Sequence, residues 1–202
     1  MRHSEIEAVV ELETQAFSDY DYFTYYFPDA MERERVQKAM IRCEYRTNFN
    51  RSCCLVAEEN GMLVGSMQLN PPTYREPSNL SYILHGWLRV YLAANRKRID
   101  AWLAMNKLAG EPCHAFAAKE ESVWYVSALT VSPKVQGTGI GTRFLNAIEE
   151  RARKAGGKWL TLYTNSENNK AFYCRRGFEV FDERTLESPT IPIKNWSLKK
   201  AL

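Results

Sequence analysis

The stretch that decides the fold is Thr-Val-Ser-Pro-Lys-Val-Gln-Gly-Thr-Gly-Ile-Gly-Thr, residues 130–142. An apolar strand pattern over residues 123–131 leads into it, and an amphipathic helix pattern leads out of it. Between them lie Gly137, Gly139 and Gly141, at alternate positions. Glycine lets a ligand approach the backbone closely and tolerates positive φ. A helix that begins right after such a turn points unpaired N–H groups and the positive end of its dipole into it. The stretch therefore predicts an anion site, most often one for phosphate.

The glycine spacing argues against two common phosphate-binding turns. A dinucleotide-binding turn reads G-x-G-x-x-G, with an acidic residue about twenty positions further on. Here Gly141 falls one residue early, and residues 160–164 contain no acid. A Walker-type loop needs a lysine directly after its last glycine, and Gly141 is followed by Thr142. The pattern that remains is Gln136-x-x-Gly139-x-Gly141.

A second motif, Asn169-x-x-Phe172-Tyr173-x-x-x-Gly177-Phe178, lies downstream. Together the two motifs resemble the Q/R-x-x-G-x-G/A turn and the N-x-x-F-Y-x-x-x-G-F segment of the GNAT N-acetyltransferases, which bind the pyrophosphate of acetyl-coenzyme A (acetyl-CoA). The resemblance covers about residues 123–183, the C-terminal half of the chain. It implies the α/β (α+β) GNAT fold, a mixed and mostly antiparallel central sheet with flanking helices, in a single N-acetyltransferase domain over residues 1–202.

The composition is that of an ordinary globular protein. With 202 residues, 45% of them hydrophobic and 25% charged, the chain is long enough for one domain with a full core. A net charge of +3 is too small to indicate a nucleic-acid partner. An apolar run long enough to span a membrane and the apolar region of a signal peptide are both missing from the sequence. We therefore expect a cytoplasmic protein with neither a nucleic acid nor a membrane as partner.

The five cysteines and three histidines do not indicate a metal site or a disulfide framework. The cysteine count is odd, and no two cysteines form C-x-x-C. The histidines have no metal-ligand spacing with one another or with the cysteines. The pattern predicts reduced thiols and no bound metal.

Strand and helix patterns fill the rest of the chain. Strand patterns at residues 53–58 and 62–69 are joined by Asn60-Gly61, the strongest short hairpin signal. The GNAT fold usually begins with a strand, but only residues 1–3 precede the first helix pattern, so that strand is expected to be absent or rudimentary. The remaining patterns predict helices at 5–17, 30–46, 142–155 and 167–176, and strands at 122–131, 159–164, 178–181 and 194–199.

A helical insertion is predicted at about residues 76–110, between the second hairpin strand and the strand at 122–131. The 3–4 spacing of apolar residues indicates two helices, at 80–95 and 96–108. Gly110-Glu111-Pro112 then reads as a loop. The insertion either packs over the sheet or forms a lid or wall over the acceptor.

An aromatic segment, residues 20–27, lies between the first two helix patterns and contains six tyrosines and phenylalanines. Its rings either pack on the core or line the acceptor cleft. In GNAT proteins this region commonly lines the substrate cleft, so both roles can hold together.

The resemblance implies a set of residues that bind acetyl-CoA. Backbone N–H groups of the glycine turn would hold the pyrophosphate, and the end of the preceding strand would pair with the pantetheine arm as an extra strand does. N–H groups of that strand could also polarise the thioester carbonyl. The set comprises Leu129, Thr130, Val131, Gln136, Gly137, Thr138, Gly139, Ile140, Gly141, Thr142, Asn169 and Phe172.

Tyr173 is the candidate general acid, because the tyrosine of this motif commonly points at the coenzyme sulfur. A phenol can donate a proton to the leaving thiolate; the alternative is a tyrosine that only packs and hydrogen-bonds. The general base is not assigned. Candidates are Tyr125 and Ser127 in the strand, Glu120 and Glu121 before it, and His114, whose ordinary pKa suits a base best. A lone histidine is more often structural.

The C-terminal half is most similar to the small-molecule GNAT branch that includes puromycin N-acetyltransferase. The similarity lies in Trp124-Tyr125, Val131-Ser132-Pro133, Phe172-Tyr173 and the Trp196 strand. It predicts transfer of an acetyl group from acetyl-CoA to a primary amine of a small molecule, by direct attack in a ternary complex. The expected partners are acetyl-CoA and a small amine, with a homodimer left open. Alternatives are an acetyltransferase for protein N-termini or lysines, and a non-catalytic acetyl-CoA sensor.

Overall fold

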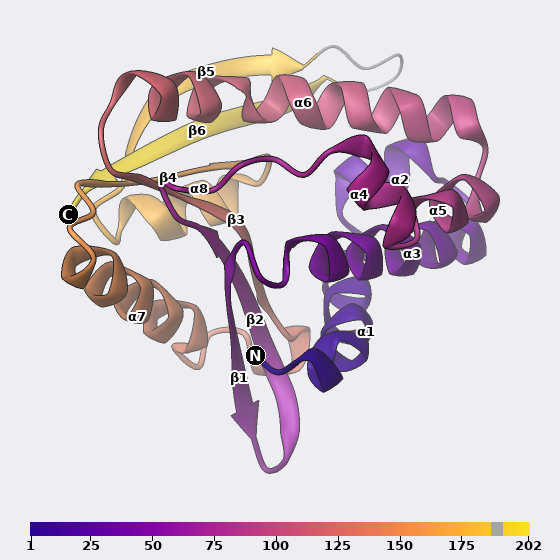
Figure 1. Cartoon of the computed structure of the whole chain (residues 1–202), viewed down its shortest axis with the longest axis horizontal. Helices are drawn as coiled ribbons and strands as arrows, with labels where there is room; N and C mark the ends of the chain where they lie inside the picture. Colours follow the sequence, from indigo (N-terminus) through magenta and orange to yellow (C-terminus); the bar gives the residue numbers. More distant parts are fainter. Residues whose placement is uncertain (187–191) are drawn as a thin grey trace.

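A six-stranded sheet runs through the centre of the computed structural model, which describes residues 1–186 and 192–202 (Figure 1). The strand order is β1-β2-β3-β4-β6-β5. Neighbouring strands are antiparallel except for the parallel pair β3 and β4. The strands are β1 Cys53–Glu59, β2 Met62–Asn70, β3 Val123–Val131, β4 Trp159–Thr164, β5 Glu179–Leu186 and β6 Ile193–Ala201. This mixed, mostly antiparallel sheet confirms the predicted fold class.

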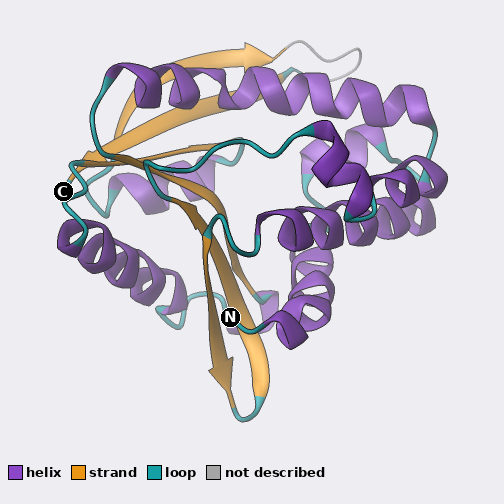
Figure 2. Cartoon of the chain, viewed as in Figure 1, coloured by secondary structure: helices purple, strands orange, loops and turns teal. Residues whose placement is uncertain are grey.

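Helices cover both faces of the sheet (Figure 2). One face packs on α7 and α8, and the other packs on α1, α2, α3, α5 and α6. The helices are α1 Ile6–Ala16, α2 Asp21–Tyr26, α3 Ala30–Asn48, α4 Asn79–Leu84, α5 Trp87–Ala93, α6 Arg96–Lys119, α7 Ile140–Lys154 and α8 Glu167–Cys174, with short 3₁₀ turns at His3–Glu5 and Pro133–Val135. The start of α7, and with it the glycine turn, follows the C-terminal end of the central strand β3.

The β1–β2 hairpin forms as its Asn-Gly signal predicted. Asn60 and Gly61 have φ of 52° and 75°, the left-handed pair that a two-residue hairpin turn requires. Cys53 packs against the α7 side of the sheet and Cys54 against the α1 side, because successive side chains of a strand point to opposite faces.

The packing of α7 on the sheet depends on a close approach. Ile140, Phe144 and Ile148 are fully or almost fully buried, at the 3–4 spacing of an apolar helix face. A Cβ added at Gly65 on β2 would lie 2.7 Å from Phe144 Cε2. The glycine in β2 therefore lets the Phe144 ring rest directly on the backbone of the sheet.

The insertion differs from its prediction in the number and length of its helices. The structure has three helices there, α4, α5 and α6, and α6 continues through Gly110 and Pro112 to Lys119. The prediction of a loop at Gly110-Glu111-Pro112 is therefore wrong. A proline inside a helix costs about 3 kcal/mol or more. Ala109, Pro112 and Cys113 lie on the buried side of α6. Asn195 Nδ2 donates to Ala109 O at 3.1 Å. This packing on β4 and β6 outweighs the cost of the proline.

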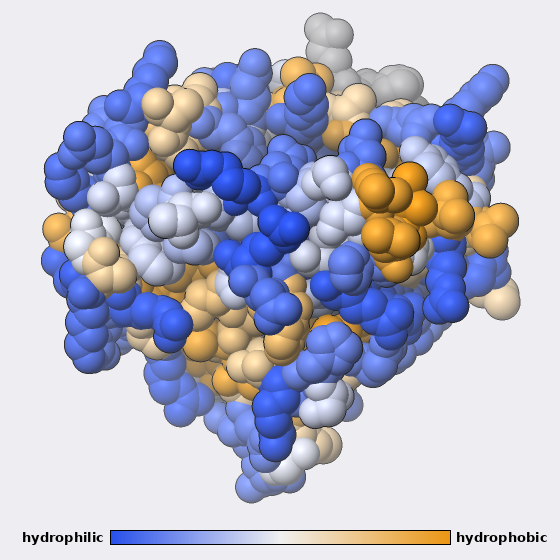
Figure 3. Space-filling view, in the orientation of Figure 1, coloured by the Kyte–Doolittle hydropathy of each residue, from blue (hydrophilic) through white to orange (hydrophobic). Residues whose placement is uncertain are grey.

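The outer surface of the insertion is apolar. Leu80, Leu84 and Leu88 expose more than half of their side chains, with relative exposures of 64%, 75% and 59%. They belong to α4 and α5, where an apolar patch gathers toward the right of the molecule in Figure 3.

The two ends of the described chain differ in how far they match the predictions. Residues before α1 form a 3₁₀ turn, and the Met1 ammonium donates to Cys54 O at 3.0 Å. The final hairpin is confirmed, with β5 and β6 longer than predicted. Pro189, predicted in its link, lies outside the described residues.

Residues 1–186 and 192–202 contain no membrane-spanning helix, no cluster of metal-binding side chains and no disulfide. No helix in this part of the chain has the length and apolar character needed to cross a membrane. No group of three or more histidine, cysteine, aspartate or glutamate side chains could hold a metal ion there. All five cysteines lie in these residues and are free thiols.

Glu13 on α1 is a buried carboxyl group at the contact between α1 and the sheet. It is 4% exposed, and its Oε1 accepts from Tyr45 OH at 2.5 Å and from Ser66 Oγ at 2.7 Å. Burial raises the pKa of Glu13 from 4.5 to about 7, although both hydrogen bonds oppose the shift. The nearby carboxylate of Glu44 raises it further.

Replacing Glu13 with glutamine is expected to change how stability depends on pH. Between about pH 4.5 and about pH 7 the folded protein holds the Glu13 proton and the unfolded chain has released it. Stability therefore falls as pH rises through this window, by on the order of 3 kcal/mol. Urea denaturation of both proteins across the window measures the difference. The wild type should lose stability relative to Glu13→Gln; parallel pH curves would contradict the prediction.

Candidate functional site

The candidate site lies where the parallel strands β3 and β4 diverge. They pair only at Val123–Trp159, Trp124–Leu160 and Tyr125–Thr161. The register between β2 and β3 shifts by one residue at Ser127, which is a β-bulge. A bulge bends the strand that carries it, so the bulge at Ser127 is suited to turn the end of β3 away from β4. Beyond Tyr125 the described pairing of β3 is with β2 alone, and its other backbone edge faces the gap.

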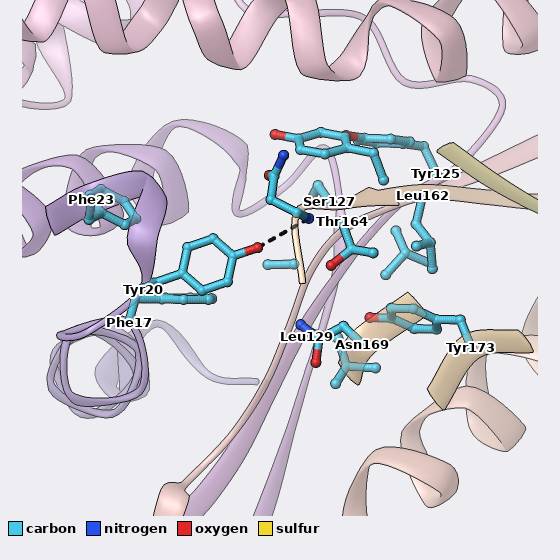
Figure 4. Close-up of a pocket in the computed structure, with 14 residues that line it drawn as sticks. Phe17, Tyr20, Phe23, Tyr125, Ser127, Leu129, Leu162, Thr164, Asn169 and Tyr173 are labelled. Carbon is cyan, nitrogen blue, oxygen red and sulfur yellow. Dashed lines mark hydrogen bonds between the residues drawn. The ribbon is translucent and has the colours of Figure 1, made fainter. Parts of the chain in front are cut away.

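The gap holds a cleft with a volume of about 140 Å³ (Figure 4). Four elements build it: the α1–α2 connection with the start of α2, the middle of β3, the end of β4 with the residue after it, and α8. Their lining side chains are Phe17, Tyr20 and Phe23; Tyr125, Val126, Ser127, Ala128 and Leu129; Leu162, Tyr163, Thr164 and Asn165; and Asn169 and Tyr173. Of the predicted coenzyme residues, Leu129 and Asn169 lie in the cleft, together with the candidate acid.

The aromatic segment takes both of the roles that the sequence allowed. Tyr22, Tyr26 and Phe27 are buried in the packing, whereas Tyr20 and Phe23 line the cleft. The Tyr20 hydroxyl accepts the Asn165 N–H at 3.2 Å (Figure 4). This bond joins the α1–α2 connection to the end of β4 and closes one side of the cleft.

The glycine turn between β3 and α7 is open and held in shape from within. Gly137 and Gly139 have φ of 84° and 89°, and a Cβ added to either would meet no atom within 4 Å. Thr138 Oγ1 donates to Val135 O at 2.7 Å, and Gln136 Nε2 donates to Val131 O at 3.3 Å. The side chains of the turn thus brace the backbone. No side chain caps the start of α7 at Gly139, and its first turn holds no acidic residue. Its N–H groups are therefore available to an anion.

Gly141 has a different reason to be glycine. It lies inside the first turn of α7, and an added Cβ would be 3.2 Å from Phe172 Cζ. The missing side chain lets α8 pack against the beginning of α7. Phe172 therefore has a packing role, and its contact with the coenzyme stays a prediction.

Tyr173 projects from α8 into the cleft, and its hydroxyl points toward the gap (Figure 4). It is 8% exposed, and its ring makes edge contacts with Phe172 and Phe178. Burial raises the pKa of this phenol above its ordinary value of 10, and Tyr20 adds to the shift. The hydroxyl is therefore protonated at neutral pH and can act as a donor.

Asn169 does not cap its helix. Ser166 is the N-cap of α8, and its hydroxyl accepts the Asn169 N–H at 3.4 Å. The Asn169 side chain lines the cleft instead. This placement favours a role in binding over the capping role that its residue type also allowed.

Three of the candidate bases lie outside the cleft. His114 is exposed on α6, where its ring lies 5.2 Å from that of Tyr125. Glu120 and Glu121 are exposed before β3, and Glu121 pairs with Lys158 at 2.7 Å. Ser127 does line the cleft, but its hydroxyl donates to Gln68 O at 3.3 Å. No carboxylate or histidine lines the cleft within the described residues.

Sequence reasoning did not identify residues 162–164 at the end of β4, or Asn165 directly after it, as part of the site. The available signal was position alone, since they end the strand predicted to border the gap. Tyr163 also binds the insertion, because its hydroxyl donates to Asn106 Oδ1 at 2.6 Å. That contact between α6 and β4 leaves no trace in the local sequence pattern.

Comparison with known proteins gives a curated relative for part of the chain. A relative from Methanocaldococcus jannaschii, described as an uncharacterized N-acetyltransferase, is 28% identical over 123 residues, or 56% of this chain and 54% of the relative. The match thus spans about half the length of this curated relative.

Solved structures resemble almost the whole chain. One, from Corynebacterium glutamicum, is described as histone acetyltransferase HPA2 and related acetyltransferase. It has a TM-score of 0.65 at 17% identity and covers 99% of this chain and 92% of its own. A polyamine N-acetyltransferase of Drosophila melanogaster has a TM-score of 0.60 at 18% identity, covering 98% and 96%. At these identities the likeness shows the fold.

The model of the acetyltransferase (GNAT) family matches residues 7–178, well over half of the chain. The match contains the bulged strand, the open glycine turn and the tyrosine on α8. The chain therefore belongs to the acetyltransferase (GNAT) family.

Proposed function

We propose that the protein transfers an acetyl group from acetyl-CoA to a primary amine of a small molecule. The observation that carries the proposal is the cleft between the diverging strands. An unpaired edge of β3 leads from it to a glycine turn suited to pyrophosphate, and a protonated tyrosine points into it. Family membership supports acetyl-CoA as the donor. The 140 Å³ volume and the aromatic wall support a small acceptor.

Binding of the donor follows from the backbone. The pyrophosphate oxygens accept hydrogen bonds from the N–H groups at the start of α7, where the helix dipole favours negative charge. The pantetheine amides pair with the edge of β3 around Leu129 and Val131, in the manner of an added strand. The thioester then lies between β3 and β4, next to the Tyr173 hydroxyl.

The reaction proceeds by direct attack. The neutral amine nitrogen attacks the thioester carbonyl carbon and forms a C–N bond, and the carbonyl oxygen gains the negative charge. An N–H group of β3 stabilises that oxygen. The intermediate collapses by breaking the C–S bond, and the leaving thiolate takes the Tyr173 proton. Because no carboxylate or histidine lines the cleft within the described residues, the proton of the amine passes to water, and water returns a proton to the Tyr173 phenolate.

The similarity to the small-molecule branch that includes puromycin N-acetyltransferase extends this proposal to the acceptor. Two of the residues that carry it line the cleft, Tyr125 in the β3 wall and Tyr173 in the α8 wall. Phe17, Tyr20 and Phe23 form an aromatic wall of the cleft, which favours a small acceptor over a long polypeptide.

Calorimetric titration with acetyl-CoA, followed by a thiol-release assay on the same sample, tests the proposal. We expect binding in the micromolar range and thiol release with small primary amines. Release with peptides alone would move the acceptor to protein N-termini or lysines. Binding without release on any amine would make the protein an acetyl-CoA sensor. Absence of binding would overturn the assignment.

A further inference from the structure

A second polar site lies one strand away from the cleft, on the side of the sheet that α3 covers. It is centred on Glu44 of α3, a half-buried carboxylate. Asn48 Nδ2 donates to its Oε1 at 2.7 Å. Two further contacts are long: Gln68 Nε2 reaches Oε1 at 3.4 Å, and Tyr82 OH reaches Oε2 at 3.4 Å. Bonds of that length are weak, so Oε2 has capacity for a better donor.

Glu44 has no cationic partner in the part of the chain that the structure describes. The groups that act on it are Gln68, Tyr82 and Asn48, which donate hydrogen bonds, and Glu76, which repels it. Burial is the main cause of its raised pKa. A half-buried carboxylate without a cation is costly. A positively charged ligand would relieve that cost.

Two tyrosine side chains lie beside this carboxylate. Tyr82 contacts it directly, and Tyr74 lies beside it, donating from its hydroxyl to Asn48 Oδ1 at 3.0 Å. Tyrosine faces attract ammonium groups through the negative charge of the ring face. A carboxylate among tyrosines therefore offers both an ion-pair partner and cation–π contacts.

The Glu44 site lies beside the cleft, on the neighbouring strand β2. Gln68, which contacts Glu44, lies opposite Ala128 in the β2–β3 register, and Ala128 lines the cleft. Adjacent strands are about 5 Å apart, so the site is one strand spacing from the cleft floor. The Ser127 hydroxyl donates to Gln68 O at 3.3 Å across that step.

We propose that Glu44, with Tyr74 and Tyr82, binds a second positively charged group of the acceptor. The preferred acceptors are then short aliphatic diamines, with one amine at the thioester and the other at Glu44. This inference rests on the proposed function, because it names the class of amine that the same cleft acetylates.

Matched pairs of amines test the proposal. Diaminobutane is compared with butylamine, and diaminohexane with hexylamine, so that each pair differs by one amino group. The wild type should have a kcat/KM at least about tenfold higher for the better diamine than for its monoamine, which is the gain of one charge-assisted contact. Glu44→Gln should reduce this ratio toward one, mainly through KM. Glu34→Gln is the control, since Glu34 is an exposed residue of the same helix that pairs with Lys38.

Equal kcat/KM for diamine and monoamine in the wild type, or an unchanged ratio in Glu44→Gln, would overturn the inference and leave the proposed function standing. Calorimetric titration of the coenzyme-bound protein with each amine gives the same comparison without turnover, so a failure of acetyl transfer is distinguishable. There too, the wild type should bind the diamine more tightly. If Glu44→Gln does not fold, Tyr82→Leu serves as the test in its place. It removes one ring and should lower the ratio of kcat/KM for diamine to that for monoamine.

Discussion

Gly139→Asp should weaken acetyl-CoA binding about a thousandfold, because it places a carboxylate at the start of α7 where the pyrophosphate binds. One unit of like charge at about 4 Å costs on the order of 4 kcal/mol near a protein surface, and the pyrophosphate carries more than one. The new side chain enters open space, since no atom lies within 4 Å of an added Cβ. Calorimetric titration with acetyl-CoA measures the loss.

Gly139→Ala separates this charge effect from backbone strain. Gly139 has a φ of 89°, so alanine and aspartate both bear the cost of the left-handed conformation, about 1 to 2 kcal/mol. Melting temperatures should fall in both variants, whereas affinity should fall steeply only with aspartate. If both variants lose affinity to the same extent, the turn shapes the protein without binding an anion, and the pyrophosphate assignment fails.

Tyr173→Phe should lower kcat on the best amine by about a hundredfold to a thousandfold, in the range that general acid–base groups contribute. Acetyl-CoA affinity should stay within about twofold of the wild type, because the ring and its packing on Phe172 and Phe178 are kept. Stopped-flow thiol release, combined with calorimetry on the same protein, measures both quantities.

The control for Tyr173 is a second tyrosine of the cleft. Tyr163 also lines the cleft, but its hydroxyl donates to Asn106. Tyr163→Phe should therefore reduce kcat less than about tenfold, below the range of a general acid. The raised pKa of Tyr173 also means that its ionisation should not limit the rate near neutral pH. A kcat unchanged in Tyr173→Phe would remove the general acid from the mechanism.

Local patterns sufficed for the turn and the hairpins because short-range chemistry determines them. Asn60-Gly61, Gly137 and Gly139 each need a backbone conformation that few residues adopt. The insertion was misread for the opposite reason. Pro112 signals a break, yet α6 continues because burial against β4 and β6 compensates. That compensation comes from strands far away in sequence.

The cleft could be predicted only in part. The second motif singled out Tyr173 and Asn169, and both line the cleft, while their roles there stay predictions. The closure by Tyr20 and Asn165 joins residues 145 positions apart, and no local pattern encodes such a contact. The Glu44 site is equally non-local, since it combines α3 with β2 and the insertion.

The position of β6 between β4 and β5 has a consequence for folding during synthesis. The β1–β2 hairpin and α1 can associate early, whereas β4 gains its antiparallel neighbour only after residues 193–201 leave the ribosome. Such pairing of distant segments is slow to form. Until then β4 is an open edge that other chains can pair with. The β6 side of the cleft wall is thus completed after the other strands of the wall, and a nascent chain is most exposed to aggregation before residues 193–201 have emerged.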